Sequence, residues 1–115
     1  MIGGFFMTQL NKLVRDKVPS LVTKDGGSYS LKLLSPLEHQ HEITKKLHEE
    51  ISEYDGATSK DAALEELVDI VELIHAALKL HDVSVEEFDA LRQQKRKHKG
   101  GFNKGIFLHE IKGIE

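Results

Sequence analysis

Four carboxylates occur in two pairs with a spacing that suits metal binding. Glu50 and Glu53 stand three residues apart in HEEISEY, and Glu66 and Asp69 repeat that spacing in LEELVDI. Residues three apart lie on one face of a helix, so the two side chains of each pair can converge. Two antiparallel helices would bring the pairs face to face, where four like charges require cations. Oxygen ligands of this kind suit magnesium or manganese.

The alternative is that these acids form an ordinary solvated face, with salt bridges between successive turns. Two observations favour the metal site. On a helical wheel Glu50 lies only about 40° from Tyr54, on the apolar side of its helix. From Glu38 to Glu72 there are eleven acidic residues against three lysines, so nearby bases cannot neutralise the acids.

Three long helices are predicted to position these carboxylates. The first begins at Ser35, where a capping box with Glu38 and a proline at the first helical position mark the start, and runs to about Tyr54. The second runs from about Ser59 to Leu80. The third begins at Ser84 with a second capping-box pattern and ends by Gly100-Gly101.

The second helix has two apolar faces. Its main face is formed by Leu64, Leu67, Val68, Val71, Ile74 and Leu78. The other face carries Leu73, Ala76, Ala77 and Leu80. Glu66 and Asp69 interrupt this second face, where an unpaired carboxylate is costly and requires an explanation.

The remaining segments are shorter. The stretch LNKLVRDKVPSLVTKDGG predicts an extended piece and then a short helix near Pro19 that stops at Gly26-Gly27. Residues 28–34 and 105–111 are β-like, and we expect them to pair with each other. The expected fold is therefore a single all-α domain, a helical bundle with minor β segments, in which residues 1–10 form a flexible N-terminal extension.

Composition narrows the class of protein. The chain has 115 residues, 39% of them hydrophobic and 30% charged, as in an ordinary globular domain. It has no cysteine, which excludes a disulfide framework and suits a cytoplasmic protein. No apolar run reaches the roughly 20 residues that span a bilayer, and MIGGFFMTQ lacks the basic start of a signal peptide. We expect no membrane partner.

The paired acids also carry a family resemblance. Glu49-Glu50-x-x-Glu53, separated by twelve residues from Glu66-x-x-Asp69, resembles the EExxE…ExxD signature of the all-α nucleoside triphosphate pyrophosphohydrolases. NKLVRDKVP and KGGFNKGIFL are similar to the ends of the small MazG-like, phosphoribosyl-ATP-pyrophosphohydrolase-like subgroup. The resemblance covers roughly residues 11–111.

The resemblance implies a reaction and a site. It implies magnesium-dependent hydrolysis of a nucleotide between its α and β phosphates, which yields a monophosphate and pyrophosphate. Its metal ligands carry over to Glu50, Glu53, Glu66 and Asp69. Glu49, with Glu50 and Glu53, falls in the catalytic motif and takes a supporting or water-activating role. Relatives of this kind are homodimers or dimers of dimers.

Basic residues are candidates for holding phosphates. Between Arg92 and Lys104 there are six basic residues and no acidic one. Arg92, Lys95 and Lys99 share a helical face and are our predicted phosphate contacts, although a solvated helix end explains them equally well. A nucleic-acid surface is disfavoured because aromatic residues do not interleave with the bases. The resemblance adds Arg15 and Lys17 on the substrate side.

Two other functions remain open on the sequence alone. One is phosphoribosyl-ATP hydrolysis in histidine synthesis. The other is a helical partner-binding module without activity. The intact set of carboxylates argues against this second alternative.

Overall fold

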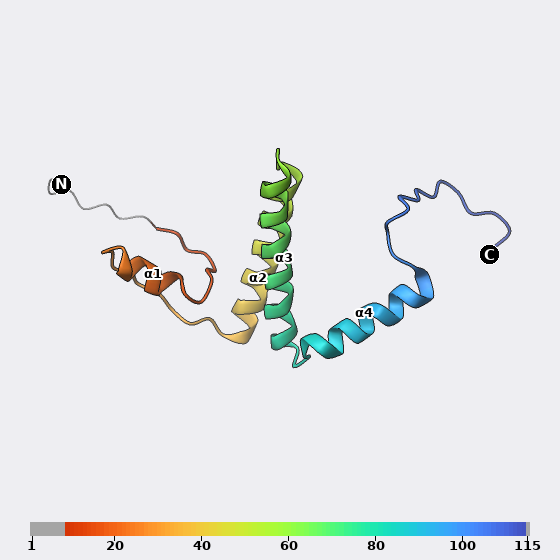
Figure 1. Ribbon diagram of the computed structural model, residues 1–115. Helices are drawn as coiled ribbons and strands as arrows, with labels where there is room; N and C mark the ends of the chain where they lie inside the picture. Colours follow the sequence, from red (N-terminus) through yellow and green to blue (C-terminus); the bar gives the residue numbers. More distant parts are fainter. Residues whose placement is uncertain (1–8, 115) are drawn as a thin grey trace.

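The computed structural model describes residues 9–114 and contains four helices (Figure 1). They are α1 (Val18–Lys24), α2 (Pro36–Asp55), α3 (Lys60–Leu80) and α4 (Val85–Lys99). The predicted all-α class is confirmed. The predicted N-terminal extension, residues 1–10, lies outside the described residues except for its last two positions. No described helix is both long and apolar enough to cross a membrane.

Serine caps start the three long helices where the sequence predicts. The Ser35 hydroxyl accepts a hydrogen bond from the backbone N–H of Glu38 at 3.2 Å, and the Glu38 carboxylate accepts one from the Ser35 N–H at 3.0 Å. This complete capping box fixes the first turn of α2. The Ser59 and Ser84 hydroxyls cap α3 and α4 in the same way, each accepting from a backbone N–H three residues on. At the far end of α4, Gly100 has a φ of +84°, which a residue with a side chain rarely adopts.

Helices α2 and α3 form an antiparallel hairpin, which is the packed part of the molecule (Figure 1). Among the described residues, Ile43 of α2 and Leu78 of α3 are the buried apolar side chains, with exposed fractions of 2% and 8%. Helix α4 approaches only α3, and α1 approaches no other helix. The hairpin therefore depends on a small apolar core.

The molecule is much more extended than a compact domain. Its radius of gyration is 19.8 Å, whereas a compact chain of this length has roughly 13 Å. Figure 1 shows why: α4 leaves the foot of the hairpin and carries the C-terminal segment away from it, while the N-terminal part lies on the opposite side.

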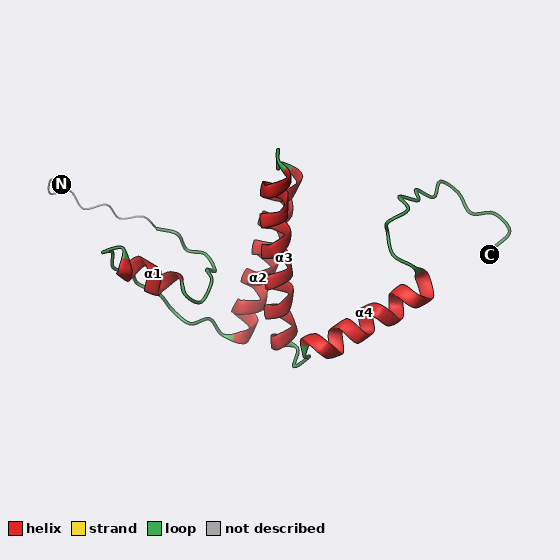
Figure 2. Cartoon of the chain, in the orientation of Figure 1, coloured by secondary structure: helices red, strands yellow, loops and turns green. Residues whose placement is uncertain are grey.

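The predicted β segments are wrong. Residues 28–34 and 105–111 contain no strand, and every residue that the structure describes is helical, turn or irregular (Figure 2). A strand requires a partner for its backbone hydrogen bonds, and a lone β-like sequence has none. Because the hairpin separates the two segments, they do not pair, and the basic C-terminal stretch is not brought back to the N-terminus.

The two apolar faces of α3 differ in how far they are buried. The face interrupted by Glu66 turns toward α2, and its apolar residues Leu73, Ala77 and Leu80 are half-buried there. The main apolar face is open to solvent over its N-terminal half, where the exposed fractions of Leu64, Leu67, Val68 and Val71 are 47%, 39%, 61% and 50%. Towards the end of the helix Ile74 is half-buried and Leu78 is buried. The hairpin thus packs through its acid-bearing face and through the end of α3, and leaves the N-terminal half of the more apolar face uncovered.

Candidate metal centre

The antiparallel packing of α2 and α3 brings three of the predicted carboxylates together. Glu50 and Glu53 come from successive turns of α2, and Glu66 comes from α3. One oxygen of each lies within 4.8 Å of the others. This group, which we call the Glu50–Glu53–Glu66 cluster, contains both acids of the first predicted pair and one acid of the second.

Burial makes this cluster unlike a solvated acidic surface. Only 5% of Glu50 is exposed, Glu66 is half-buried, and Glu53 is exposed. The Oε2 atoms of Glu50 and Glu66 are buried and have no hydrogen-bond partner among the described residues. The other oxygen of Glu50 lies 3.9 Å from Nζ of Lys46, so one lysine faces it at long range. Buried carboxylate oxygens without partners are costly, and a cation would satisfy them.

The pKa of Glu66 reflects the repulsion among the three carboxylates of the cluster. The adjacent Glu50 carboxylate, together with burial and the proximity of Glu53, raises the pKa of Glu66 to about 8. At neutral pH, and without a metal ion, Glu66 therefore keeps its proton. A divalent cation would take the place of that proton.

The donor set fits a hard divalent ion. All three converging side chains offer carboxylate oxygens, and the chain has no cysteine to supply sulfur. Oxygen ligands of this kind suit Mg²⁺ and Mn²⁺, with water completing the coordination. The unpartnered Oε2 atoms of Glu50 and Glu66 are the observation on which this fit rests.

Asp69, the fourth predicted ligand, lies outside the cluster. Its Oδ1 accepts a hydrogen bond from Nη2 of Arg15 at 2.5 Å. Arg15, a predicted substrate contact, is therefore brought to the edge of the candidate site. The role of Asp69 as a metal ligand stays a prediction.

Glu49 also lies outside the cluster, on the solvent side of α2. Its carboxylate is 42% exposed and lies 4.0 Å from Nζ of Lys12 and 3.9 Å from Nζ of Lys46. Neither contact fixes it tightly, so the water-activating role of Glu49 stays a prediction.

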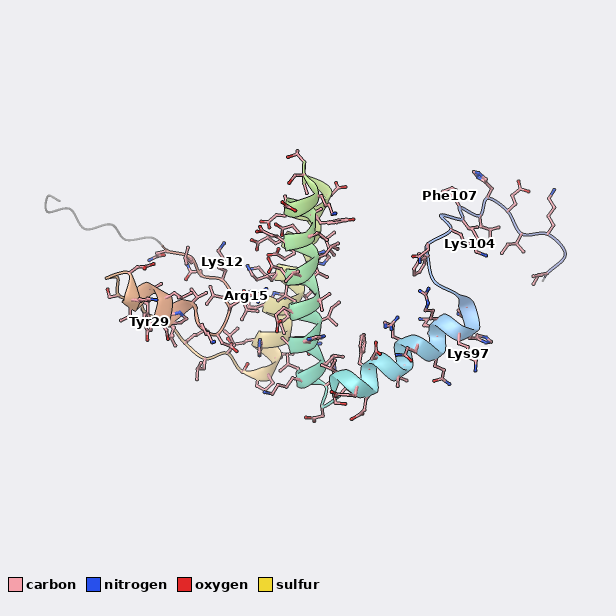
Figure 3. The ribbon with its side chains drawn as sticks, in the orientation of Figure 1. Lys12, Arg15, Tyr29, Lys97, Lys104 and Phe107 are labelled. Carbon is pink, nitrogen blue, oxygen red and sulfur yellow. The ribbon has the colours of Figure 1, made fainter. Side chains whose placement is uncertain are left out.

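The predicted basic contacts divide into two groups. Figure 3 shows Lys12 and Arg15 beside the hairpin, while Lys97 and Lys104 lie along the arm formed by α4 and the C-terminal segment. Within one chain α4 does not approach α2, so it does not bring its bases to the cluster. Nε of Arg92 instead pairs with Oδ1 of Asp89 on its own helix at 2.8 Å.

The remaining predicted basic contacts lie apart from the acids. Lys95 borders a shallow depression on α4, and Lys99 is exposed in the last turn. Lys17 precedes α1, is exposed, and makes no ion pair with another described residue. Substrate contacts by Lys17, Arg92, Lys95 and Lys99 stay predictions.

Sequence reasoning gave Lys46 no role, although it lies against the site. Its Nζ is 3.9 Å from both the Glu49 and the Glu50 carboxylates. The signal was present, because Lys46 stands three and four residues before these acids, the spacing at which helical side chains meet. Lys12, which lies 4.0 Å from Glu49, has no such local signal.

Comparison with known proteins adds one partial relative. No family model matches the sequence, and no solved structure matches it. A protein of Mycolicibacterium smegmatis, described only as uncharacterized, is 39% identical over 54 residues. The match covers 47% of this chain and 55% of that protein, so the chain spans about half the length of the curated relative it matches. Membership of the pyrophosphohydrolase family stays a prediction.

Proposed function

We propose that this protein is a magnesium-dependent nucleotide pyrophosphohydrolase whose site is the Glu50–Glu53–Glu66 cluster. The observation that supports the proposal most is Glu50, a carboxylate that is 5% exposed and lies beside two other glutamates. One of its oxygens is buried and has no hydrogen-bond partner within residues 9–114. The EExxE…ExxD resemblance supplies the reaction. Its first motif lies on α2 and its second on α3, as that signature requires.

Each side chain has a task in this proposal. Glu50, Glu53 and Glu66 would hold the ion, and Asp69 would add a ligand from the next turn of α3. Bound Mg²⁺ would orient the phosphates and lower the pKa of the attacking water. Glu49, exposed at the rim, is the carboxylate available to accept that water's proton.

The basic N-terminal segment would receive the phosphates. Lys12 and Arg15 stand at the edge of the cluster in this chain, and both are more than two-fifths exposed. An arginine presents a planar fork of donors that matches phosphate oxygens. The proposed reaction would take place in the reducing cytoplasm, which we expect from the lack of cysteine.

A pyrophosphate-release assay tests the reaction. The full chain would be incubated with Mg²⁺ and a panel of nucleoside triphosphates, together with phosphoribosyl-ATP, the substrate of the alternative function in histidine synthesis. We expect release from at least one compound, and loss of release in Glu53→Gln, which keeps the shape of the side chain and removes a ligand charge. Absence of release throughout the panel, or full activity of Glu53→Gln, would contradict the proposal.

We also propose that the protein acts as a homo-oligomer, a dimer or a dimer of dimers. The support is the uncovered apolar face of α3, which carries Leu64, Leu67, Val68 and Val71. A run of exposed apolar side chains along one helix is typical of an interface. The same face would serve a non-catalytic partner-binding module, and the assay for pyrophosphate distinguishes the two.

A further inference from the structure

The N-terminal segment is tied to the hairpin by charge. Nη2 of Arg15 donates to Oδ1 of Asp69, 54 residues further along the chain, and Lys12 lies 4.0 Å from Glu49. Every other hydrogen bond made by a side chain among the described residues joins positions six or fewer apart. The Arg15–Asp69 pair is therefore a tertiary contact that the local helical pattern does not require.

Asp69 stands within reach of the cluster. It lies three residues after Glu66 on α3, so the two side chains leave neighbouring positions on one side of the helix. Its carboxylate is 38% exposed, which leaves room for the side chain to rotate. In the structure its Oδ1 instead accepts the hydrogen bond from Arg15.

Arg15 also serves the cluster as a positive charge. Asp69, and at longer range Glu72 and Glu50, raise the pKa of the Arg15 guanidinium, which is charged at any physiological pH. The guanidinium therefore supplies, beside the cluster, part of the positive charge that a divalent ion would supply there. Because 55% of Arg15 is exposed, the ion pair is well solvated and opens at little cost.

We infer that the Arg15–Asp69 ion pair is a latch: it keeps Asp69 out of the metal site until a divalent cation binds. When Asp69 turns toward the cation, Arg15 is released. A released guanidinium beside a metal site is placed to take a phosphate oxygen of an anionic ligand. Arg15 and Asp69 also border a shallow groove, whose lining of Asp61, Leu64, Glu65 and Val68 includes none of the cluster residues.

The second step, in which Arg15 passes from Asp69 to a phosphate, rests on the proposed function. It has a thermodynamic consequence. If the cation frees Arg15 for the nucleotide, then each ligand must tighten the binding of the other by the same factor. Arg15 therefore acts on the metal indirectly, as a positioning residue for Asp69, and contacts the substrate directly.

Binding of Mn²⁺ alone tests the latch without any reaction. Free Mn²⁺ would be measured by electron paramagnetic resonance in titrations of the full chain, as wild type, Arg15→Gln, Asp69→Asn and the double variant. We expect Arg15→Gln to tighten Mn²⁺ binding by about two- to fivefold, the range set by a solvated ion pair. In the Asp69→Asn background the same substitution should give a clearly smaller gain, because no ligand is left to release.

A general effect of charge is controlled by Lys12→Gln. This substitution also removes one positive charge from the N-terminal segment, but its partner is Glu49 and not Asp69. Its effect on Mn²⁺ affinity should be equal in the wild-type and the Asp69→Asn backgrounds. Circular dichroism would confirm that every variant keeps the helical content of wild type.

The outcomes separate the latch from the proposed function. An equal gain from Arg15→Gln in both backgrounds, or no gain, would overturn the latch and leave the metal site standing. Failure of wild type and all variants to bind Mn²⁺ would overturn the metal site and the latch together. With Mn²⁺ bound, affinity for a triphosphate with a methylene α–β bridge should fall in Arg15→Gln; unchanged affinity would overturn the transfer of Arg15 to phosphate.

Discussion

Glu50 is nearly enclosed by protein, although a glutamate is among the side chains least often buried. Its neighbour Glu53 adds negative charge instead of compensating it, and Glu66 avoids adding more only by keeping its proton up to a pKa of about 8. Lys46 lies 3.9 Å from one oxygen, beyond hydrogen-bonding distance. A site of this kind is destabilising in the metal-free protein and becomes favourable only when a cation is present.

The first prediction therefore concerns Glu50→Gln. The variant keeps the shape of the side chain and removes the buried charge, so its metal-free melting temperature should equal or exceed that of wild type. Wild type should gain about 2.7 kcal/mol of stability when free Mg²⁺ is 100 times its Kd, and the variant should gain much less. Thermal melts with and without Mg²⁺ measure both effects.

Glu49→Gln is the matched control for this experiment. Glu49 precedes Glu50 in the same helix but lies outside the cluster. It should retain most of the stabilisation by Mg²⁺. Equal stabilisation of both variants would contradict the assignment of Glu50 as a ligand.

The second prediction concerns pH. Because the pKa of Glu66 is raised from 4.5 to about 8, the metal-free folded state holds a proton that the unfolded chain has lost between these values. Stability of the metal-free protein should therefore fall as pH rises through this window. A cation displaces that proton, so Mn²⁺ affinity should increase with pH and level off above about 8.

Calorimetry in two buffers with different ionisation enthalpies would count the protons released on Mn²⁺ binding. We expect release below about pH 8, declining above it, and little pH dependence in Glu66→Gln. An affinity that does not change between pH 6 and 8 would show that Glu66 is not a ligand.

The residues of the site could be predicted only where the signal is local. Glu50, Glu53 and Glu66 follow from helical spacing, since a period of 3.6 residues fixes which side chains meet. The contact between Arg15 and Asp69 spans 54 positions and depends on where an irregular segment lies, which no local pattern encodes. The position of Glu49 at the rim depends in the same way on the rotation of α2 against α3.

At the scale of the elements, α2 and α3 place the cluster, and little apolar surface holds them together. Ile43 and Leu78 are the buried apolar side chains in the described part of the chain, at 2% and 8% exposure. The boundaries of these helices were predictable because Ser35 and Ser59 act as caps through contacts three residues away. The conformation of residues 28–34 and 105–111 was not predictable in this way, because a strand depends on hydrogen bonds with a distant partner.

The third prediction tests this small core. Ile43→Ala removes a fully enclosed side chain and should destabilise the protein by about 2–5 kcal/mol. Leu37→Ala, in the first turn of the same helix but 78% exposed, should change stability by less than about 0.5 kcal/mol. Urea denaturation of both variants makes the comparison. A similar loss in both would mean that burial of Ile43 is not what holds the hairpin.

At the scale of the whole molecule, the extended shape leaves apolar surface without cover. The hairpin exposes Val68 and Val71 on α3, and α4 exposes Leu91. A radius of gyration of 19.8 Å in a chain of 115 residues is more typical of an open protomer than of a self-contained domain. This shape was not predictable from helix boundaries, because α4 has the same sequence pattern whether it folds back or projects.

The fourth prediction concerns association through α3. Val71→Asp places a charge on the uncovered face and should shift the protein toward smaller species in light scattering coupled to gel filtration. Leu91→Asp makes the same change at a 61% exposed position of α4 and should leave the mass unchanged. A monomeric wild type, or an effect of Leu91→Asp alone, would exclude α3 as the interface.

The most direct test of the central claim is the identity of the bond that is cut. Phosphorus NMR would identify the products that wild-type protein and Mg²⁺ form from a triphosphate that the protein hydrolyses. Analogues blocked at the α–β or at the β–γ bridge would be tested in parallel. We expect equal amounts of monophosphate and pyrophosphate, no cleavage of the α–β analogue, and cleavage of the β–γ analogue. Diphosphate and orthophosphate as products would contradict this expectation, even if Glu50, Glu53 and Glu66 were shown to bind Mg²⁺.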